Sequence, residues 1–171
     1  EIMPSLVGSE MCIRDRFKIT LKIDRKFGDL LPFNYQYEQS AVIYRILAQA
    51  DTQYSAWLHE NGYLLHERKR FKLFCYSPFI FEKVRPLPEA GCLKIIGERA
   101  VWYISFIPEK STLEFIQGIF AHQSFSIGNK EHRVAFDVVG VEAIPMPQLS
   151  EEMTFVALSP ICVKLHEAIV R

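Results

Sequence analysis

Apolar and polar side chains alternate along residues 17–24, FKITLKID, and this pattern predicts a strand with one buried face. Residues 36–50 then carry apolar side chains three and four positions apart, which predicts an amphipathic helix. Asp51 or Thr52 can cap a second short helix, and Gly62 suits its C-terminal end. The first third of the chain is therefore predicted as a strand followed by two helices.

Residues 70–82, RFKLFCYSPFIFE, are rich in aromatic side chains and predict a strand with an interruption at its proline. Alternation along this strand places Lys72 with Phe74 on one face and Leu73 with Cys75 on the other. We expect Lys72 to lie on the more open of the two faces.

Two further apolar runs, LKIIG at 93–97 and VWYISFI at 101–107, flank a short polar link and predict a hairpin. Pro108 suits the start of a helix that runs to about Ala121. The apolar stripe predicted for this helix contains Leu113, Ile116, Gln117 and Phe120. A tight turn at 127–129, a strand within 132–144, a Pro-rich link and a last strand at 155–165 are expected to follow.

This order of elements predicts an α+β fold, a ferredoxin-like βαββαβ sandwich with helices on one face of an antiparallel sheet. Residues 16–145 form this predicted domain, and residues 146–171 are expected to be a linker and the first strand of a second, truncated ferredoxin-like domain. Residues 1–15 show neither helical nor strand periodicity, and the string SLVGSEMCIRDR looks like a translated sequencing adapter. We expect residues 1–15 to be non-native.

The composition indicates the class of protein but does not identify an activity. The 171 residues are 49% hydrophobic and 23% charged, which is typical of one soluble globular domain. Lys plus Arg and Asp plus Glu both number 20, so any nucleic-acid binding must use a local basic patch. Four scattered cysteines without a secretory signal favour reduced thiols and a cytoplasmic protein, and no apolar run is long enough to span a membrane.

Candidate chemistry lies between the first helix and the strand at residue 72. Cleavage of RNA without a metal requires a proton acceptor, a proton donor and positive charge near the phosphate. Tyr44, His59 and Lys72 carry suitable groups, and His66 is a lower-ranked substitute for His59. The alternative for these residues is structural, because a Tyr often borders a buried stripe and a His often ends a short helix.

The basic run Arg68, Lys69 and Arg70 could hold phosphate groups, although a solvated loop explains it equally well. No GxGxxG motif, P-loop or zinc-ligand spacing occurs, so neither a cofactor nor a metal is predicted.

Five segments resemble, in order, parts of the CRISPR-associated repeat-RNA-processing endoribonucleases, the Cas-six family of the RAMP superfamily. They are RFKITLKI, LPFNYQYEQSAVIYRIL, WLHE, RFKLFCYSPFIF and FVALSPICV. WLHE followed by FKLFCYS is the most specific part. The glycine-rich loop found near the C-terminus of the family is absent from this sequence.

The resemblance implies a two-domain enzyme that cuts precursor CRISPR transcripts without metal, leaving a 2′,3′-cyclic phosphate and a 5′-hydroxyl. It assigns proton transfer to His59, stabilisation of phosphate charge to Lys72, and positioning or proton donation to Tyr44. The implied partner is CRISPR repeat RNA, with effector-complex subunits and a second copy of the chain as further candidates. The alternatives are a non-catalytic repeat-RNA-binding or scaffold subunit and a purely structural fragment.

Overall fold

Antiparallel strands of one central sheet form the frame of the molecule in the computed structural model, which describes residues 15–65, 69–107, 109–145 and 150–154. The strands of this sheet, in spatial order, are β10 (Ser124–Gly128), β11 (Arg133–Ile144), β1 (Asp15–Asp24), β9 (Arg99–Phe106) and β5 (Phe74–Tyr76). A two-residue strand, β6 (Ile80–Phe81), also pairs with β9. Each of these pairs is antiparallel, as the alternating pattern of β1 predicts.

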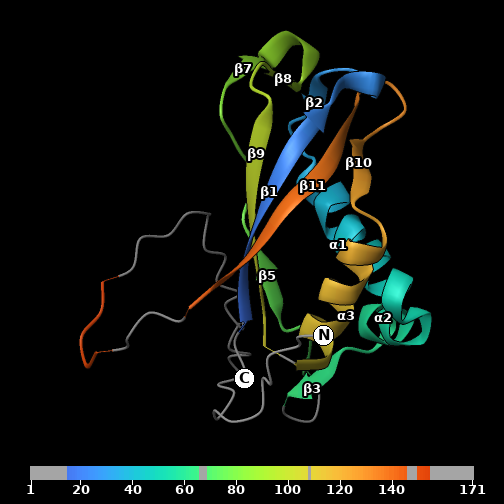
Figure 1. Ribbon diagram of the computed structural model, residues 1–171, viewed down its shortest axis with the longest axis vertical. Coiled ribbons are helices and arrows are strands. Elements are labelled where there is room, and N and C mark those ends of the chain that lie inside the picture. Colours follow the sequence, from blue (N-terminus) through green and yellow to red (C-terminus); the bar gives the residue numbers. More distant parts are fainter. Residues whose placement is uncertain (1–14, 66–68, 108, 146–149, 155–171) are drawn as a thin grey trace, which may run out of the picture.

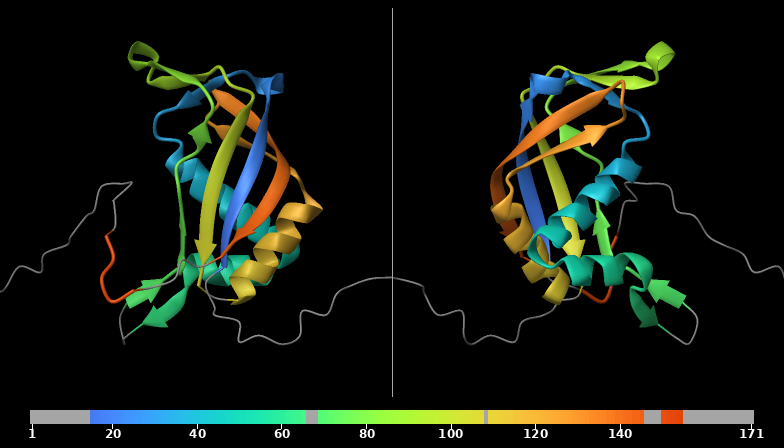
Figure 2. Two further views of the ribbon diagram at one scale, coloured as in Figure 1. Left: turned by 60° about the vertical axis from the view of Figure 1, so that its left-hand side comes forward. Right: turned by 90° about the vertical axis from the view of Figure 1, so that its right-hand side faces the viewer.

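Three helices complete the frame: α1 (Gln36–Ala50), α2 (Thr52–Glu60) and α3 (Glu109–Ala121). Helices α1 and α3 lie side by side on one face of the central sheet (Figure 2). The large side chains Trp102, Phe106, Phe115 and Phe136 are fully buried in the layer between them and the sheet. The predicted ferredoxin-like βαββαβ fold is therefore confirmed, with β10 as an additional edge strand.

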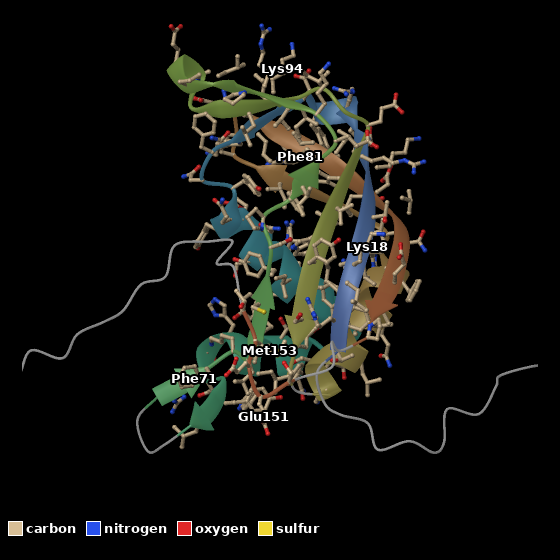
Figure 3. The ribbon with its side chains drawn as sticks, turned by 90° about the vertical axis from the view of Figure 1, so that its left-hand side faces the viewer. Lys18, Phe71, Phe81, Lys94, Glu151 and Met153 are labelled. Carbon is tan, nitrogen blue, oxygen red and sulfur yellow. The ribbon has the colours of Figure 1, made fainter. Side chains whose placement is uncertain are left out.

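Two small sheets lie at opposite ends of the molecule (Figure 1). One contains β2 (Leu30–Pro32), β8 (Cys92–Ile95) and β7 (Val84–Leu87), and short 3₁₀ turns, η1 (Arg25–Phe27) and η2 (Pro88–Ala90), flank it. The other is a hairpin of β3 (Tyr63–Leu65) and β4 (Lys69–Phe71) that follows α2. Figure 3 shows Lys94 in the first of these small sheets and Phe71 in the second.

The predicted hairpin of residues 93–97 and 101–107 is wrong. Strand β8 pairs with β2 and β7, whereas β9 pairs with β1, β5 and β6 in the central sheet. The guanidinium group of Arg25 donates to the carbonyl oxygens of Ile95, Ile96 and Gly97 at 3.0–3.1 Å. The link between β8 and β9 is thus held by a side chain distant in sequence, at the point where the chain passes from one sheet to the other.

The predicted continuous strand at 70–82 is also wrong. It is divided into β4, β5 and β6, and the first division falls at Leu73, whose φ of +56° lies in the left-handed region. This turn reverses the expected alternation, because Phe74 and Tyr76 pack against the core while Cys75 is exposed. Lys72 consequently lies between two strands and is partly buried, not on an open strand face.

The buried side of α3 differs from the predicted stripe. Leu113 and Phe120 are 53% and 59% exposed, and the buried side chains include Ser111, Phe115 and Ile119. Helix α3 approaches α1 closely at Gly118, where a Cβ would clash with the backbone of Ile46. Hydrophobic periodicity alone does not reveal that close approach.

Several sequence predictions fall on residues outside the described ranges. These are the non-native segment, apart from Asp15, which begins β1, together with the predicted strand at 155–165 and most of segment 146–171. The domain boundaries at 16 and 145 therefore stay predictions. None of the helices in the described part of the chain is long and apolar enough to cross a membrane.

Candidate active site

The junction between α1 and α2 places the end of α2 beside the middle of α1. Asp51 caps α2 by accepting a hydrogen bond from the backbone N–H of Tyr54 at 2.8 Å. That hydrogen bond, followed by an interaction with Lys110, lowers the pKa of Asp51. The buried Ser55 hydroxyl donates to the Tyr44 carbonyl oxygen at 2.8 Å. Helix α2 is therefore fastened to α1 at the residue predicted to take part in catalysis.

Tyr44 and His59 are in contact. Their ring centroids are 5.0 Å apart, and the ring planes meet at 82°, an edge-to-face arrangement. His59 is exposed in the last turn of α2, whereas Tyr44 is partly buried and also packs edge-to-face against Phe74 at 5.8 Å. Burial, and to a lesser degree the neighbouring Tyr76, raises the pKa of Tyr44. Its phenol stays protonated at neutral pH and can donate a hydrogen bond.

Lys72 lies at the same end of α2 as His59. Its ammonium group donates to the carbonyl oxygens of Leu58 and His59, at the end of the helix where a positive charge is favourable. Partial burial, and then the nearby charge of Arg70, lowers the pKa of Lys72. An ammonium group carries three N–H donors. Two are directed at helix carbonyls, which leaves one for a ligand.

Gly62 allows the chain to bring Lys72 to the end of α2. Its φ is +68°, and a Cβ there would lie 2.8 Å from the carbonyl oxygen of Phe71. The chain can turn directly from α2 into β3 only because this position has no side chain. The β3–β4 hairpin then returns the chain to Lys72.

The structure describes only part of the basic run at residues 68–70. Arg68 lies outside the described residues, as does the alternative histidine, His66, and the side chain of Lys69 is likewise not described. Arg70 is exposed, and its guanidinium donates to Asn61 Oδ1 at 2.9 Å. Of the three predicted phosphate-binding residues, Arg70 alone can thus be placed beside the end of α2.

Next to Lys72 lies a hollow of about 290 Å³ with mostly apolar walls. It is lined by Phe71, Leu73, Phe74, Cys75, Ser105 and Ile107 in addition to Lys72 itself. Phe71 and Ile107 are 40% and 49% exposed. Among the described residues, no group of three or more His, Cys, Asp or Glu side chains could hold a metal ion. The groups present here can transfer protons and bind anions.

A hydroxyl cluster behind α2 was not predicted from the sequence. The Tyr54 hydroxyl is hydrogen-bonded to the buried Ser111 hydroxyl of α3 and, at 2.9 Å, to the Tyr63 hydroxyl of β3. Burial is the main cause that raises the pKa of Tyr54 well above its ordinary value. Ser111 is distant in the chain from both tyrosines, so no local pattern connects the cluster. Together they fix α2, and with it His59, against α3 and β3.

Replacing Tyr54 by phenylalanine should lower the free energy of unfolding by about 1–2 kcal/mol, because the buried Ser111 hydroxyl loses its partner. Urea unfolding followed by circular dichroism measures the change. Tyr37→Phe is the matched control, since Tyr37 is 80% exposed and should leave stability unchanged. Equal stability of Tyr54→Phe and the original chain would mean that the cluster does not hold α2.

Comparison with known proteins identifies relatives with the same architecture. A family model described as "CRISPR-associated protein Cas6, N-terminal" matches residues 30–137. The chain is also 25% identical over 136 residues to the CRISPR-associated endoribonuclease Cas6 1 of Methanocaldococcus jannaschii, a match that covers 80% of this chain and 48% of that protein.

Solved structures give a consistent result for the fold. A RAMP protein described as binding different RNA substrates and the product of a Cas6-related gene from Pyrococcus furiosus both align with a TM-score of 0.61 and 22% identity. These alignments cover 80% of this chain and 51% and 50% of the two structures. A CRISPR-associated protein Cas6 aligns with a TM-score of 0.56 and 24% identity. The chain spans about half the length of the relatives it matches.

Proposed function

Because the chain belongs to the CRISPR-associated Cas6 family, whose N-terminal part it matches, we propose that it cleaves CRISPR repeat RNA in precursor transcripts without a metal ion. One observation carries the proposal: the Tyr44 ring rests against His59, and Lys72 is bound to the same end of α2. The three residues come from α1, α2 and the segment after the β3–β4 hairpin, and their proximity supports a common role.

The proposed reaction is an attack by the ribose 2′-oxygen on the adjacent phosphorus. The 2′-OH gives up its proton, the bond from the 2′-oxygen to phosphorus forms, and the bond from phosphorus to the 5′-oxygen breaks. The departing 5′-oxygen takes up a proton. The products are a 2′,3′-cyclic phosphate and a 5′-hydroxyl, so atoms and charge balance without water or metal.

Each residue has a role that fits its environment. His59 is exposed to solvent, so its imidazole can reach an RNA strand and take or give a proton. Tyr44 is held protonated by burial, which suits it to donate a hydrogen bond to a phosphate oxygen. The remaining N–H of Lys72 would stabilise the negative charge that develops on the phosphate.

The apolar hollow supports the same location for the substrate. Phe71 presents an aromatic surface beside Lys72, and the hollow behind it is bordered by Leu73 and Ile107. A nucleobase next to the cleaved phosphate could pack there, because every base has an apolar face that stacks on aromatic side chains. Arg70 lies on the same side and could contact the phosphate backbone.

The test is incubation of the chain with end-labelled RNA containing the CRISPR repeat of its source genome, in the presence of EDTA. We expect cleavage at one position in the repeat, and the 3′ end of the upstream fragment should resist a phosphatase until acid opens a cyclic phosphate. Cleavage that EDTA abolishes would contradict the metal-independent mechanism. Tight binding without cleavage would favour the repeat-RNA-binding or scaffold role instead.

A further inference from the structure

Three adjoining hollows surround the edge strand β10, on a side of the molecule that the proposed active site does not use. They measure about 250, 250 and 210 Å³, and all three are bordered by Ser126. Two lie between β10 and α1, and the third lies between β10 and η1. We call this surface the β10 groove and define it by Phe27, Arg45, Ser126 and Arg133.

The β10 groove carries positive charges that no carboxylate neutralises. Arg45 and Arg133 are both exposed, and within the described ranges neither forms an ion pair. Glu38 borders one of the hollows without pairing with either arginine. In a chain of zero net charge, two unpaired guanidinium groups at one groove form a local anion-binding surface.

An exposed aromatic ring lies at one end of the groove. Phe27 is 53% exposed, and Arg133 lies over its ring at 5.9 Å from the centroid. Lys26 is also near this ring, at 5.4 Å, although Asp24 pairs with its ammonium group at 3.1 Å. An aromatic face flanked by cations is the combination with which proteins bind single-stranded nucleic acid, the ring stacking on a base and the cations contacting phosphates.

The groove is separate from the proposed active site. Arg45 directly follows Tyr44 on α1, and consecutive residues of an α-helix project about 100° apart. Tyr44 packs against His59 and Phe74, whereas the Arg45 guanidinium donates to the Ser126 carbonyl oxygen of β10 at 3.2 Å. Figure 1 shows β10 beside α1 on the side away from β5. Helix α1 therefore stands between the two surfaces.

We propose that the β10 groove binds a second stretch of the RNA strand, with phosphates at Arg45 and Arg133 and a base stacked on Phe27. The identification of RNA as the ligand rests on the proposed function. An added peptide strand is the competing occupant of an exposed sheet edge. The Arg45 guanidinium already occupies the carbonyl oxygen of Ser126, so this part of the edge is blocked to a peptide strand.

The experiment measures binding of the 171-residue chain to a fluorescein-labelled oligouridylate by anisotropy, from about 50 to 200 mM salt. The test variant is Arg45→Gln combined with Arg133→Gln. The matched control is Arg85→Gln combined with Arg99→Gln, which removes two exposed charges from β7 and β9 instead; neither arginine has an ion-pair partner among the described residues. Circular dichroism confirms that both variants fold, and cleavage of repeat RNA is measured separately.

We expect the groove variant to bind about tenfold more weakly, with the slope of log K against log salt reduced by about 1.4, since each phosphate contact on a single strand contributes about 0.7. The control variant should retain the original slope. Phe27→Ala should weaken binding by about fivefold or more without changing the slope, whereas the equally exposed Phe120→Ala should not.

Equal slopes for the groove variant and the original chain would overturn the proposal, as would equal losses in the two double variants. Failure of the original chain to bind oligouridylate would also overturn it and would leave the groove to a protein partner. Failure of repeat-RNA cleavage alone would refute only the proposed catalytic function. Binding that depends on the groove would then still identify an RNA-binding surface.

Discussion

Replacing His59 by alanine is expected to slow cleavage of repeat RNA by about 100- to 10,000-fold, the range typical of a lost proton-transferring side chain. His59 is the exposed member of the Tyr44–His59 pair, and it lies in the last turn of a helix that hydrogen bonds hold to α1 and α3. Among the described residues its imidazole has no hydrogen-bond partner and only packs against the Tyr44 ring, so its loss should leave the fold intact. RNA affinity should change little.

The measurement is a single-turnover rate with protein in excess over RNA, so that product release does not limit the result. His132→Ala is the matched control, because this histidine lies in the turn between β10 and β11, remote from the Tyr44–His59 pair. The control should cleave at the original rate. An undiminished rate in His59→Ala would exclude His59 from the chemistry and would bring His66 back into consideration as the proton-transferring residue.

Local patterns predicted the elements that carry Tyr44 and His59. The bounds of α1 and α2 follow from apolar spacing and from the Asp51 cap, both of which are determined by neighbours in the sequence. Since the two helices are consecutive, the short connection between them also restricts where α2 can lie. The contact between Tyr44 and His59 is therefore largely a consequence of local structure.

The position of Lys72 could not be predicted in the same way. Strand alternation assumes a continuous extended backbone, and the left-handed conformation of Leu73 interrupts it. The Lys72 ammonium group donates to carbonyl oxygens at the end of α2. This interaction forms because the β3–β4 hairpin brings the chain back to that helix. The family resemblance indicated Lys72 as a site residue, whereas periodicity placed Lys72 on an open strand face, which is wrong.

The β10 groove likewise had no signature in the sequence. Its members come from η1, α1, β10 and β11, so they share no spacing along the chain. Arg45 and Arg133 are 88 positions apart in the sequence and border one groove only when β10 is added to the edge of the sheet. Runs of basic residues, such as 68–70, are visible in a sequence, but patches assembled by folding are not.

Gly118→Ala is expected to lower the stability of the protein, because Gly118 lies where α3 packs against α1. In an exposed helix this change would stabilise the protein by about 1 kcal/mol, because glycine is a poor helix former. At Gly118, however, a Cβ would lie deep within contact distance of the Ile46 carbonyl oxygen and 2.8 Å from its carbonyl carbon. Both are backbone atoms of α1, so no side chain can rotate away.

We therefore expect Gly118→Ala to lower the free energy of unfolding by about 2 kcal/mol, which for a chain of this length lowers Tm by roughly 4–8 °C. Thermal unfolding followed by circular dichroism measures the shift. Gly140→Ala is the control, since a Cβ there would meet Thr20 at 3.8 Å, an ordinary contact, and should leave Tm unchanged. A Tm for Gly118→Ala at or above the original value would mean that α1 and α3 can separate at little cost. In that case, the close approach of the two helices would not be what excludes larger side chains from the buried face of α3.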